Sequence, residues 1–287
     1  MTLVAAWVRR TGTPEEELVV ASDSRLSGGL TWDQGPKLFP LARGDCVLAF
    51  AGDTAFAYPV VLQILLYLQD FEGASTRRLP LEELISHLEK LVTHLLRDVR
   101  ELPAGSQLKE EFHLLVAGRS VLTRAWRTWI SRFDAKKQTF HLVKPGRQHT
   151  SVGATLIGDG AVEARKLLGS QLRPQRGRPL HLGWEPFDVL RDMIRSQKHR
   201  TVGGPIQLVA VQQRLATMSF AVMWPQWKKG KLTLLGRELL EYERTQRLAF
   251  DPDNHEVLLT WDYLDEPEPL STKRKRLKDE GIDPREP

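Results

Sequence analysis

The stretch TLVAAWV (residues 2–8) opens the chain with an apolar run that is typical of a buried strand. Residues near a chain end usually make few contacts, so an apolar pattern that starts at Thr2 indicates a terminus tied into the fold. A loop signal with Gly12 and Pro14 follows, and LVVASDSR (residues 18–25) then predicts a second strand that turns polar at its end. These two strands predict a hairpin at the start of the chain.

Farther along the chain, several segments with the pattern of strands are followed by several segments with the 3.6-residue period of helices. Strands are expected over residues 37–41, 46–52, 112–118, 124–134, 138–144, 203–212, 217–224 and 231–239. Helices are expected over residues 54–71, 81–101 and 185–199, and residues 154–168 predict a strand, a glycine turn and a helix. Segregated blocks favour an α+β fold. We expect a four-layer αββα sandwich, two antiparallel sheets with a helix pair on each outer face.

The composition is that of a soluble globular protein, with 41% hydrophobic and 27% charged residues in 287. The longest apolar stretch (residues 56–68) is shorter than the roughly 20 residues that span a bilayer, and no signal peptide is recognisable. The single cysteine, Cys46, lies in an apolar run and is expected to be a buried thiol. These features favour a cytoplasmic protein. No metal-ligand spacing, phosphate loop or dinucleotide motif is present, so no cofactor is expected.

The chain is expected to divide into a main domain (residues 1–235), an extension packed on it (residues 236–270) and a charged disordered tail (residues 271–287). The extension is compatible with an extra helix and strand. The net charge of +5 lies partly in the tail, but it is weaker than the basic stripe of a nucleic-acid binder. Nucleic-acid binding through Lys273–Lys278 is therefore the least favoured function.

Four segments in order, TLVAAWV, LVVASDSRLSGG, PKLFPL and VLAFAGDTA, resemble the opening of proteasome β-subunits and of the bacterial HslV peptidase. The resemblance covers Thr2–Asp70 and continues more weakly through residues 112–118, 154–168 and 202–211. It implies an N-terminal nucleophile hydrolase of αββα fold. It further implies a peptide or protein substrate, a homo-oligomer and an unfoldase or targeting partner.

The resemblance assigns roles to five residues. Thr2 is the nucleophile once Met1 is removed, and its own α-amine, with an ordinary pKa of about 7.7–8.0, is the base. Lys37 favours the neutral amine through its positive charge, and Asp23 pairs with this lysine. Arg25 matches a neighbouring family arginine, and the Gly52 N–H matches the oxyanion-hole donor.

The sequence departs from the family pattern in its second half. Asp159 stands where the family has a serine between two glycines, and His199 and Val202 replace an aspartate and a serine before the Gly203–Gly204 pair. A replacement pair between Asp159 and His199 is one interpretation. A solvated turn residue and a helix-end histidine are the other.

Three further alternatives stay open from the sequence. Aligning Met1 instead of Thr2 with the family nucleophile would leave a dead site, although the small residue Ala6 favours the Thr2 register. Trp32 and Phe50 are either apolar walls of a substrate pocket or core residues. The leading function is a threonine peptidase, and the alternative is a non-catalytic scaffold or binding subunit of the same fold.

Overall fold

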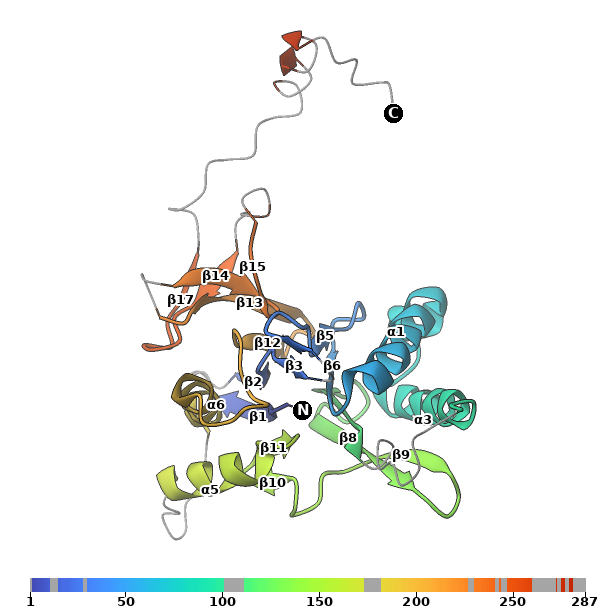
Figure 1. Ribbon diagram of the computed structural model, residues 1–287. Coiled ribbons are helices and arrows are strands. Elements are labelled where there is room, and N and C mark those ends of the chain that lie inside the picture. The colour runs from blue at the N-terminus through green and yellow to red at the C-terminus, as the bar shows by residue number, and fades with distance from the viewer. Residues whose placement is uncertain are drawn as a thin grey trace.

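The computed structural model describes residues 2–10, 15–27, 30–100, 111–172, 182–226, 230–240, 243 and 247–259, together with five single positions between 272 and 280. Met1, the loop around Gly12 and Pro14, the pair Gly28 and Gly29, and most of the predicted tail lie outside the described residues. Two large β-sheets and two groups of helices make up the described part (Figure 1).

The larger sheet has ten strands, ordered β10-β11-β1-β2-β12-β13-β14-β15, with β16 beside β13 and β17 beside β16. All its pairings are antiparallel except that of β13 with β16. Its strands are β1 (Val4–Arg10), β2 (Glu16–Ser22), β10 (Thr150–Ser151), β11 (Ala154–Ile157), β12 (Gln207–Gln212), β13 (Thr217–Trp224), β14 (Lys231–Leu234), β15 (Arg237–Glu238), β16 (Leu248–Phe250) and β17 (Val257–Leu259). The predicted first hairpin thus lies inside the sheet, with β1 between β11 and β2.

The second sheet is antiparallel and has the order β5-β6-β7-β8-β9. Its strands are β5 (Leu38–Pro40), β6 (Cys46–Ala51), β7 (His113–Arg119), β8 (Trp126–Asp134) and β9 (Thr139–Val143). A separate two-stranded hairpin joins β3 (Leu26–Ser27) to β4 (Thr31–Trp32). The fold is therefore α+β with antiparallel sheets, as predicted.

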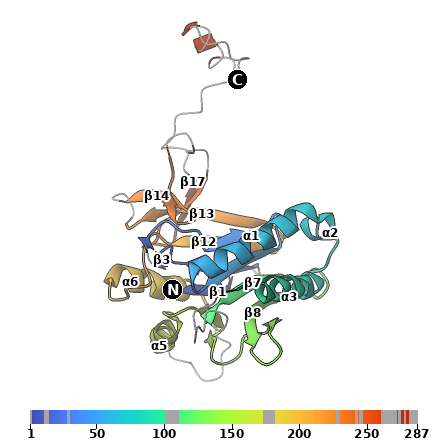
Figure 2. The ribbon, with the colours of Figure 1, turned by 45° about the vertical axis from the view of Figure 1, so that its right-hand side comes forward.

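Helices cover both sheets (Figures 1 and 2). The described helices are α1 (Thr54–Asp70), α2 (Glu72–Ser75), α3 (Leu81–Arg97), α5 (Ala161–Gln171) and α6 (Glu185–Ser196). Asp53 caps α1, because its side chain accepts a hydrogen bond from the Phe56 N–H at 3.2 Å. In Figure 1, α1 and α3 lie to the right of the strands, and α5 and α6 lie to the left.

Alternation along the strands divides the core into three clusters. Val4 and Ala6 of β1 face a cluster shared by the two sheets. Ala5 and Trp7 of β1, and Leu3 just before it, face the cluster under α5 and α6. The same alternation in β6 sends Val47, Ala49 and Ala51 to the shared cluster, and Cys46, Leu48 and Phe50 to the cluster under α1 and α3. The start of the chain is therefore enclosed by apolar packing on both faces of β1.

Beyond residue 235, the strands β15, β16 and β17 belong to the ten-stranded sheet. Most residues between 241 and 246, in the segment expected to hold an extra helix and strand, lie outside the described residues. The expected boundary between residues 235 and 236 falls within the turn that joins β14 to β15. Among the described residues, no helix is long and apolar enough to cross a membrane.

Cys46 is fully buried, as predicted, and burial raises the pKa of its thiol well above the ordinary value. Its neighbour Asp45 forms a fully buried ion pair with Arg43, whose Nε lies 2.6 Å from Asp45 Oδ1. The Arg43 guanidinium also donates to the carbonyls of Ala74 and Leu79, at 3.2 and 3.0 Å. This pair fixes the connection between α2 and α3 to the second sheet.

Candidate active site

Asp23, directly after β2, is the centre of a buried hydrogen-bond cluster. Its Oδ1 accepts from the Leu3 N–H at 3.0 Å and from Lys37 Nζ at 2.9 Å. Its Oδ2 accepts from the N–H groups of Arg25 and Gly203, at 3.2 and 3.1 Å. A carboxylate that accepts several hydrogen bonds is held in one orientation. Asp23 therefore joins the start of the chain, Lys37 and the Gly203 loop.

Lys37 precedes β5 and is fully buried, as is Asp23. Burial lowers the pKa of Lys37, while the charge and hydrogen bond of Asp23 act in the opposite direction. A second carboxylate, that of Asp159, also raises this pKa through its charge. The predicted pair of Asp23 and Lys37 is thus present, in surroundings that water does not reach.

Thr2 lies one residue before the Leu3 N–H that binds Asp23, and it is only 1% exposed. Its carbonyl oxygen faces Gly158, where an added Cβ would lie 2.0 Å from that oxygen and 3.4 Å from Ala51 Cβ. Gly158 also has a φ of +98°, so a glycine is required there on both counts. Since Gly52 follows Ala51, the geometry brings Thr2, Gly52 and the Asp23–Lys37 pair to one end of the two sheets.

Arg25 is directed into a different contact. Its Nε and Nη2 bind the two carboxylate oxygens of Asp33 at 2.6 and 2.8 Å, and its Nη1 donates to the Arg200 carbonyl at 3.3 Å. The hydrogen bond to Asp33 raises the pKa of Arg25, and the same bond lowers the pKa of Asp33. The guanidinium lies so close to Gly203 that a Cβ there would be 2.4 Å from Arg25 Cζ. Arg25 therefore holds loops together beside the site.

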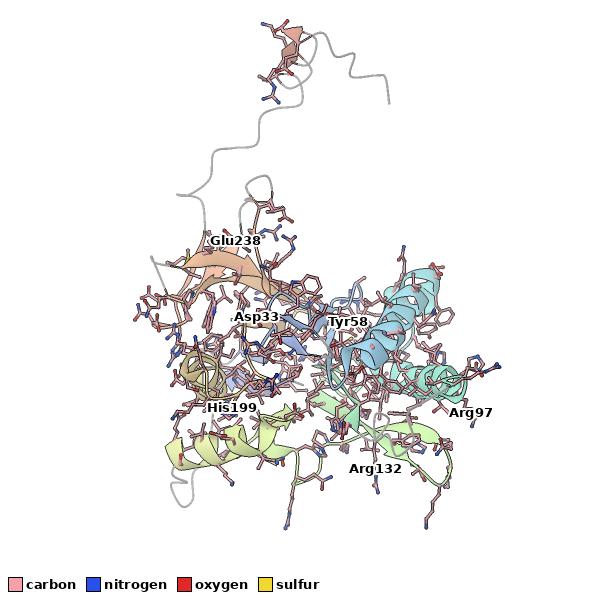
Figure 3. The ribbon with its side chains drawn as sticks, in the orientation of Figure 1. Asp33, Tyr58, Arg97, Arg132, His199 and Glu238 are labelled. Carbon is pink, nitrogen blue, oxygen red and sulfur yellow. The ribbon has the colours of Figure 1, made fainter. Side chains whose placement is uncertain are left out.

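The structure separates Asp159 from His199. The His199 Nε2 lies 3.3 Å from Glu163 Oε2, and among the described residues no ion pair joins His199 to Asp159. Burial raises the pKa of Asp159, and the charge of Lys37 opposes that rise. Figure 3 places His199 by the α5 and α6 helices, away from Asp33 and Tyr58. The suggested replacement pair is therefore absent.

Val202 is 1% exposed and belongs to the apolar cluster under α5 and α6. A Cβ placed on Gly160 would lie 3.2 Å from its Cγ2. The position where the resemblance has a serine is thus part of the hydrophobic core. The Val202 side chain fills space beside the site and has no polar atom that could form a hydrogen bond.

The two candidate pocket residues have opposite environments. Phe50 is fully buried and packs against Phe39 and Tyr58, with ring centroids 6.2 and 5.3 Å away, so it is a core residue under α1. Trp32, on the β3–β4 hairpin, is 57% exposed. Burial raises the pKa of Tyr58 to about 12, and its hydroxyl donates to the Pro36 carbonyl at 3.2 Å. Tyr58 thereby ties α1 to the residue before Lys37.

The sequence reasoning missed Gln207, the first residue of β12. Its side chain is fully buried and hydrogen-bonded to the backbone of the segments that carry Asp23 and Lys37. A glutamine in the otherwise apolar run PIQLVAV (residues 205–211) was the available signal. Buried polar side chains are nearly always hydrogen-bonded, so a glutamine in a buried strand indicates a specific hydrogen-bond partner.

Two histidines lie between the sheets near this end of the fold. The rings of His113, in β7, and His149, before β10, have centroids 6.1 Å apart. Neither Nδ1 atom has a hydrogen-bond partner in the described part of the chain. Burial lowers the pKa of both imidazoles, and the charges of His113 and Arg165 lower that of His149 further.

These pKa values predict acid destabilisation. Below the ordinary histidine pKa of 6.5, the unfolded chain binds more protons at these positions than the folded chain. The free energy of unfolding is therefore expected to fall as the pH drops through 6.5, and to level off below the folded pKa values. Urea unfolding at about pH 7.5 and about pH 5.5 measures this loss.

The double variant His113→Gln, His149→Gln is expected to lose less stability over this interval than the unmodified protein. His141→Gln is the matched control, because His141 is exposed and its ring Nε2 lies 3.0 Å from Thr139 Oγ1. An identical drop in the double variant and in the unmodified protein would contradict the assignment.

The part of the chain that the structure describes contains no group of three or more histidine, cysteine, aspartate or glutamate side chains placed to hold a metal ion. The chemistry of the cluster is that of charge and hydrogen bonding: a buried ammonium, a carboxylate with four donors, and a hydroxyl residue beside them.

No protein-family model and no curated protein matches the chain. Among solved structures, it is similar to Anbu (ancestral beta-subunit) from Yersinia bercovieri, with a TM-score of 0.53 and 18% sequence identity. The similarity covers 76% of this chain and 86% of that one. At this identity the likeness concerns the fold alone. The narrower assignment to the proteasome β-subunit or HslV type is wrong, because the solved structure that matches is described as Anbu.

Proposed function

We propose that the protein is a threonine-type N-terminal nucleophile hydrolase that cleaves amide bonds in peptides or proteins. Thr2 is the nucleophile in this proposal, after removal of the residue that precedes it. Asp23, Lys37 and Gly52 support its chemistry. Arg25 orders the loops beside them through Asp33.

One observation carries the proposal. A fully buried lysine and a fully buried aspartate lie at the beginning of the chain, and the aspartate binds the Leu3 N–H through the same oxygen that binds the lysine. Burying two charges costs several kcal/mol for each ion. The pair of Asp23 and Lys37 binds the residue after Thr2, whereas the equally buried pair of Arg43 and Asp45 binds the connection between α2 and α3. A positive charge beside an α-amine lowers the pKa of that amine, which makes it a base near neutral pH.

In the proposed reaction, the Thr2 hydroxyl oxygen attacks the substrate carbonyl carbon while its proton passes to the Thr2 α-amine. The tetrahedral intermediate carries an oxyanion, for which the Gly52 N–H is the proposed donor. Its collapse breaks the C–N bond, and the ammonium returns the proton to the leaving amine. Water then hydrolyses the ester at Thr2, which releases a carboxylic acid and restores the hydroxyl.

Other parts of the proposal rest on the sequence resemblance. We propose the four-layer αββα arrangement, in which the two sheets stack between the α1–α3 and α5–α6 pairs. We propose further that the protein acts as a cytoplasmic homo-oligomer, without a cofactor, and with an unfoldase or targeting partner. Residues 1–235 are proposed to form the catalytic domain, with residues 236–270 packed on it. The exposed Trp32 is a proposed contact for substrate.

Covalent capture of Thr2 tests the function. Protein prepared with Thr2 as its first residue is incubated with a peptide β-lactone, whose ring opens when a hydroxyl attacks its carbonyl. We expect an intact-mass gain of one acyl group, mapped to Thr2, in the unmodified protein and in Thr2→Ser. Thr2→Ala should show no gain. Absence of acylation in folded protein with a free Thr2 amine would overturn the proposal.

A non-catalytic scaffold of the same fold is the second candidate. The observation that favours it is Val202, whose side chain is buried among apolar residues where the resemblance has a serine. In that case the β-lactone would leave Thr2 unmodified, while the protein would still assemble into its oligomer. Sedimentation and intact mass on one sample distinguish the two candidates.

A further inference from the structure

Gln207 makes four hydrogen bonds with its side-chain amide, all to backbone groups. Its Oε1 accepts from the N–H groups of Lys37 and Leu38, at 3.0 and 3.2 Å. Its Nε2 donates to the carbonyls of Asp23 and Gly35, at 3.2 and 2.9 Å. Two donors on one side and two acceptors on the other allow only one orientation of the amide.

These four backbone groups belong to the two segments that carry the buried ion pair. Asp23 directly follows β2, and Lys37 directly precedes β5. The amide of Gln207 lies between the backbones of these two residues and bonds to both. Because Gln207 is fully buried and all four bonds are made inside the protein, water does not substitute readily for any of them.

The helix α1 also holds the segment that carries Lys37. The Tyr58 hydroxyl donates to the carbonyl of Pro36, the residue before Lys37. Gln207 and Tyr58 thus fix the backbone on both sides of the lysine, and the Asp23 carboxylate fixes its Nζ.

The turn between β14 and β15 closes the other side of Gln207. A Cβ on Gly236 would lie 3.2 Å from Gln207 Nε2, 3.3 Å from the Gly35 carbonyl oxygen and 2.6 Å from Ser24 Cβ. Gly236 also has a φ of +92°, which a residue with a side chain rarely adopts. The segment beyond residue 235 therefore packs directly on the amide that joins Asp23 to Lys37.

We propose that Gln207 is a positioning residue that sets the placement of the Lys37 ammonium relative to Asp23 and thereby the charge beside Thr2. This inference rests on the proposed function for its catalytic consequence, although the placement of Lys37 is measurable without it. Gln207 does not touch the reacting atoms. It acts through the backbones of Asp23 and Lys37.

Gln207→Met tests the proposal, because methionine has a similar length and no amide. The maximal rate of Thr2 acylation by the β-lactone is expected to fall about 100-fold, the loss that a displacement of about 1 Å in a catalytic group produces. The β-lactone concentration at half-maximal rate should stay the same, since the residue contacts no substrate. Gln207→Glu keeps the acceptor for Lys37 and Leu38 but loses the donor, so an intermediate rate is expected.

A titration of the Lys37 side chain distinguishes a positioning role of Gln207 from a general loss of stability. The Lys37 side chain is followed by NMR in protein labelled with ¹³C-lysine, and its signal is assigned by its absence in Lys37→Met. Asp23 raises the pKa of Lys37 and burial lowers it, so a looser contact with Asp23 should shift the Lys37 midpoint to lower pH. The alkaline limb of the acylation rate should move in the same direction. Gln207→Glu gives the same readout if Gln207→Met does not fold.

Val209→Ala is the matched control. Val209 lies two residues along β12, is equally buried and faces the core shared by the sheets, and its side chain belongs to that apolar cluster. This variant should lose stability but keep the Lys37 midpoint and the acylation rate. An unchanged Lys37 midpoint in both Gln207 variants would overturn the inference. If the unmodified protein is not acylated at all, the proposed function fails, while the Lys37 titration still decides the role of Gln207.

Discussion

Replacing Asp23 with alanine is expected to lower the free energy of unfolding by about 3–5 kcal/mol, the cost of removing one partner from a buried ion pair. The variant leaves the Lys37 ammonium buried without its carboxylate. It also removes the acceptor of three backbone N–H groups, those of Leu3, Arg25 and Gly203. Urea unfolding monitored by fluorescence measures the change.

Two further variants sharpen this test. Adding Lys37→Met to Asp23→Ala removes the unpaired charge and is expected to recover part of the lost stability. Asp45→Ala breaks the equally buried ion pair between Asp45 and Arg43. That pair is distant from Thr2 in the sequence, and its arginine binds the carbonyls of Ala74 and Leu79. It should cost a similar free energy and leave Thr2 acylation unchanged. A cost below about 1 kcal/mol for Asp23→Ala, typical of a surface substitution, would contradict the cluster.

Lys37→Met is expected to slow Thr2 acylation about 100- to 10,000-fold, the range over which a positioned proton-transfer system accelerates reactions. Without the positive charge, the α-amine of Thr2 reverts toward its ordinary pKa of about 7.7–8.0 and is more protonated at neutral pH. The acid limb of the rate should therefore move to higher pH. Stopped acylation reactions, analysed by intact mass across a pH series, give both quantities.

Lys37→Arg is not expected to rescue the rate, because Lys37 is fully buried and the larger guanidinium has no room beside Asp23. Lys136→Met is the control for loss of a lysine as such, since Lys136 is exposed on the turn after β8. A Lys37→Met rate within about twofold of the unmodified protein would remove Lys37 from the mechanism.

The sequence was informative where chemistry is local. Unbroken apolar runs located β1, β2 and β6, and the 3.6-residue period located α3. Asp23 and Lys37 were predicted as a pair because each has a fixed place relative to a strand end in the resembling family, and the structure has them 2.9 Å apart. Their roles in catalysis stay predictions.

Contacts between distant segments were not predictable in the same way. Gln207 binds groups about 170 and more residues away in the chain, and no local pattern specifies that partner. Phe50 belongs to the core because β6, an unbroken apolar run, is buried on both faces. His199 pairs with Glu163 of α5 because the end of α6 packs beside that helix.

The position of β1 inside the larger sheet has a consequence for the order of biosynthesis. Thr2 is synthesised before its neighbours in the fold: Val4 pairs with Ile157, and the Gly203 N–H that completes the Asp23 cluster comes 180 residues after that aspartate. The Gly236 turn that closes on Gln207 is made later still. A nascent chain therefore contains Thr2 long before the groups that surround it have been synthesised. Under the proposed function, this order of synthesis leaves the Thr2 hydroxyl without its supporting groups while unfinished chains are close by.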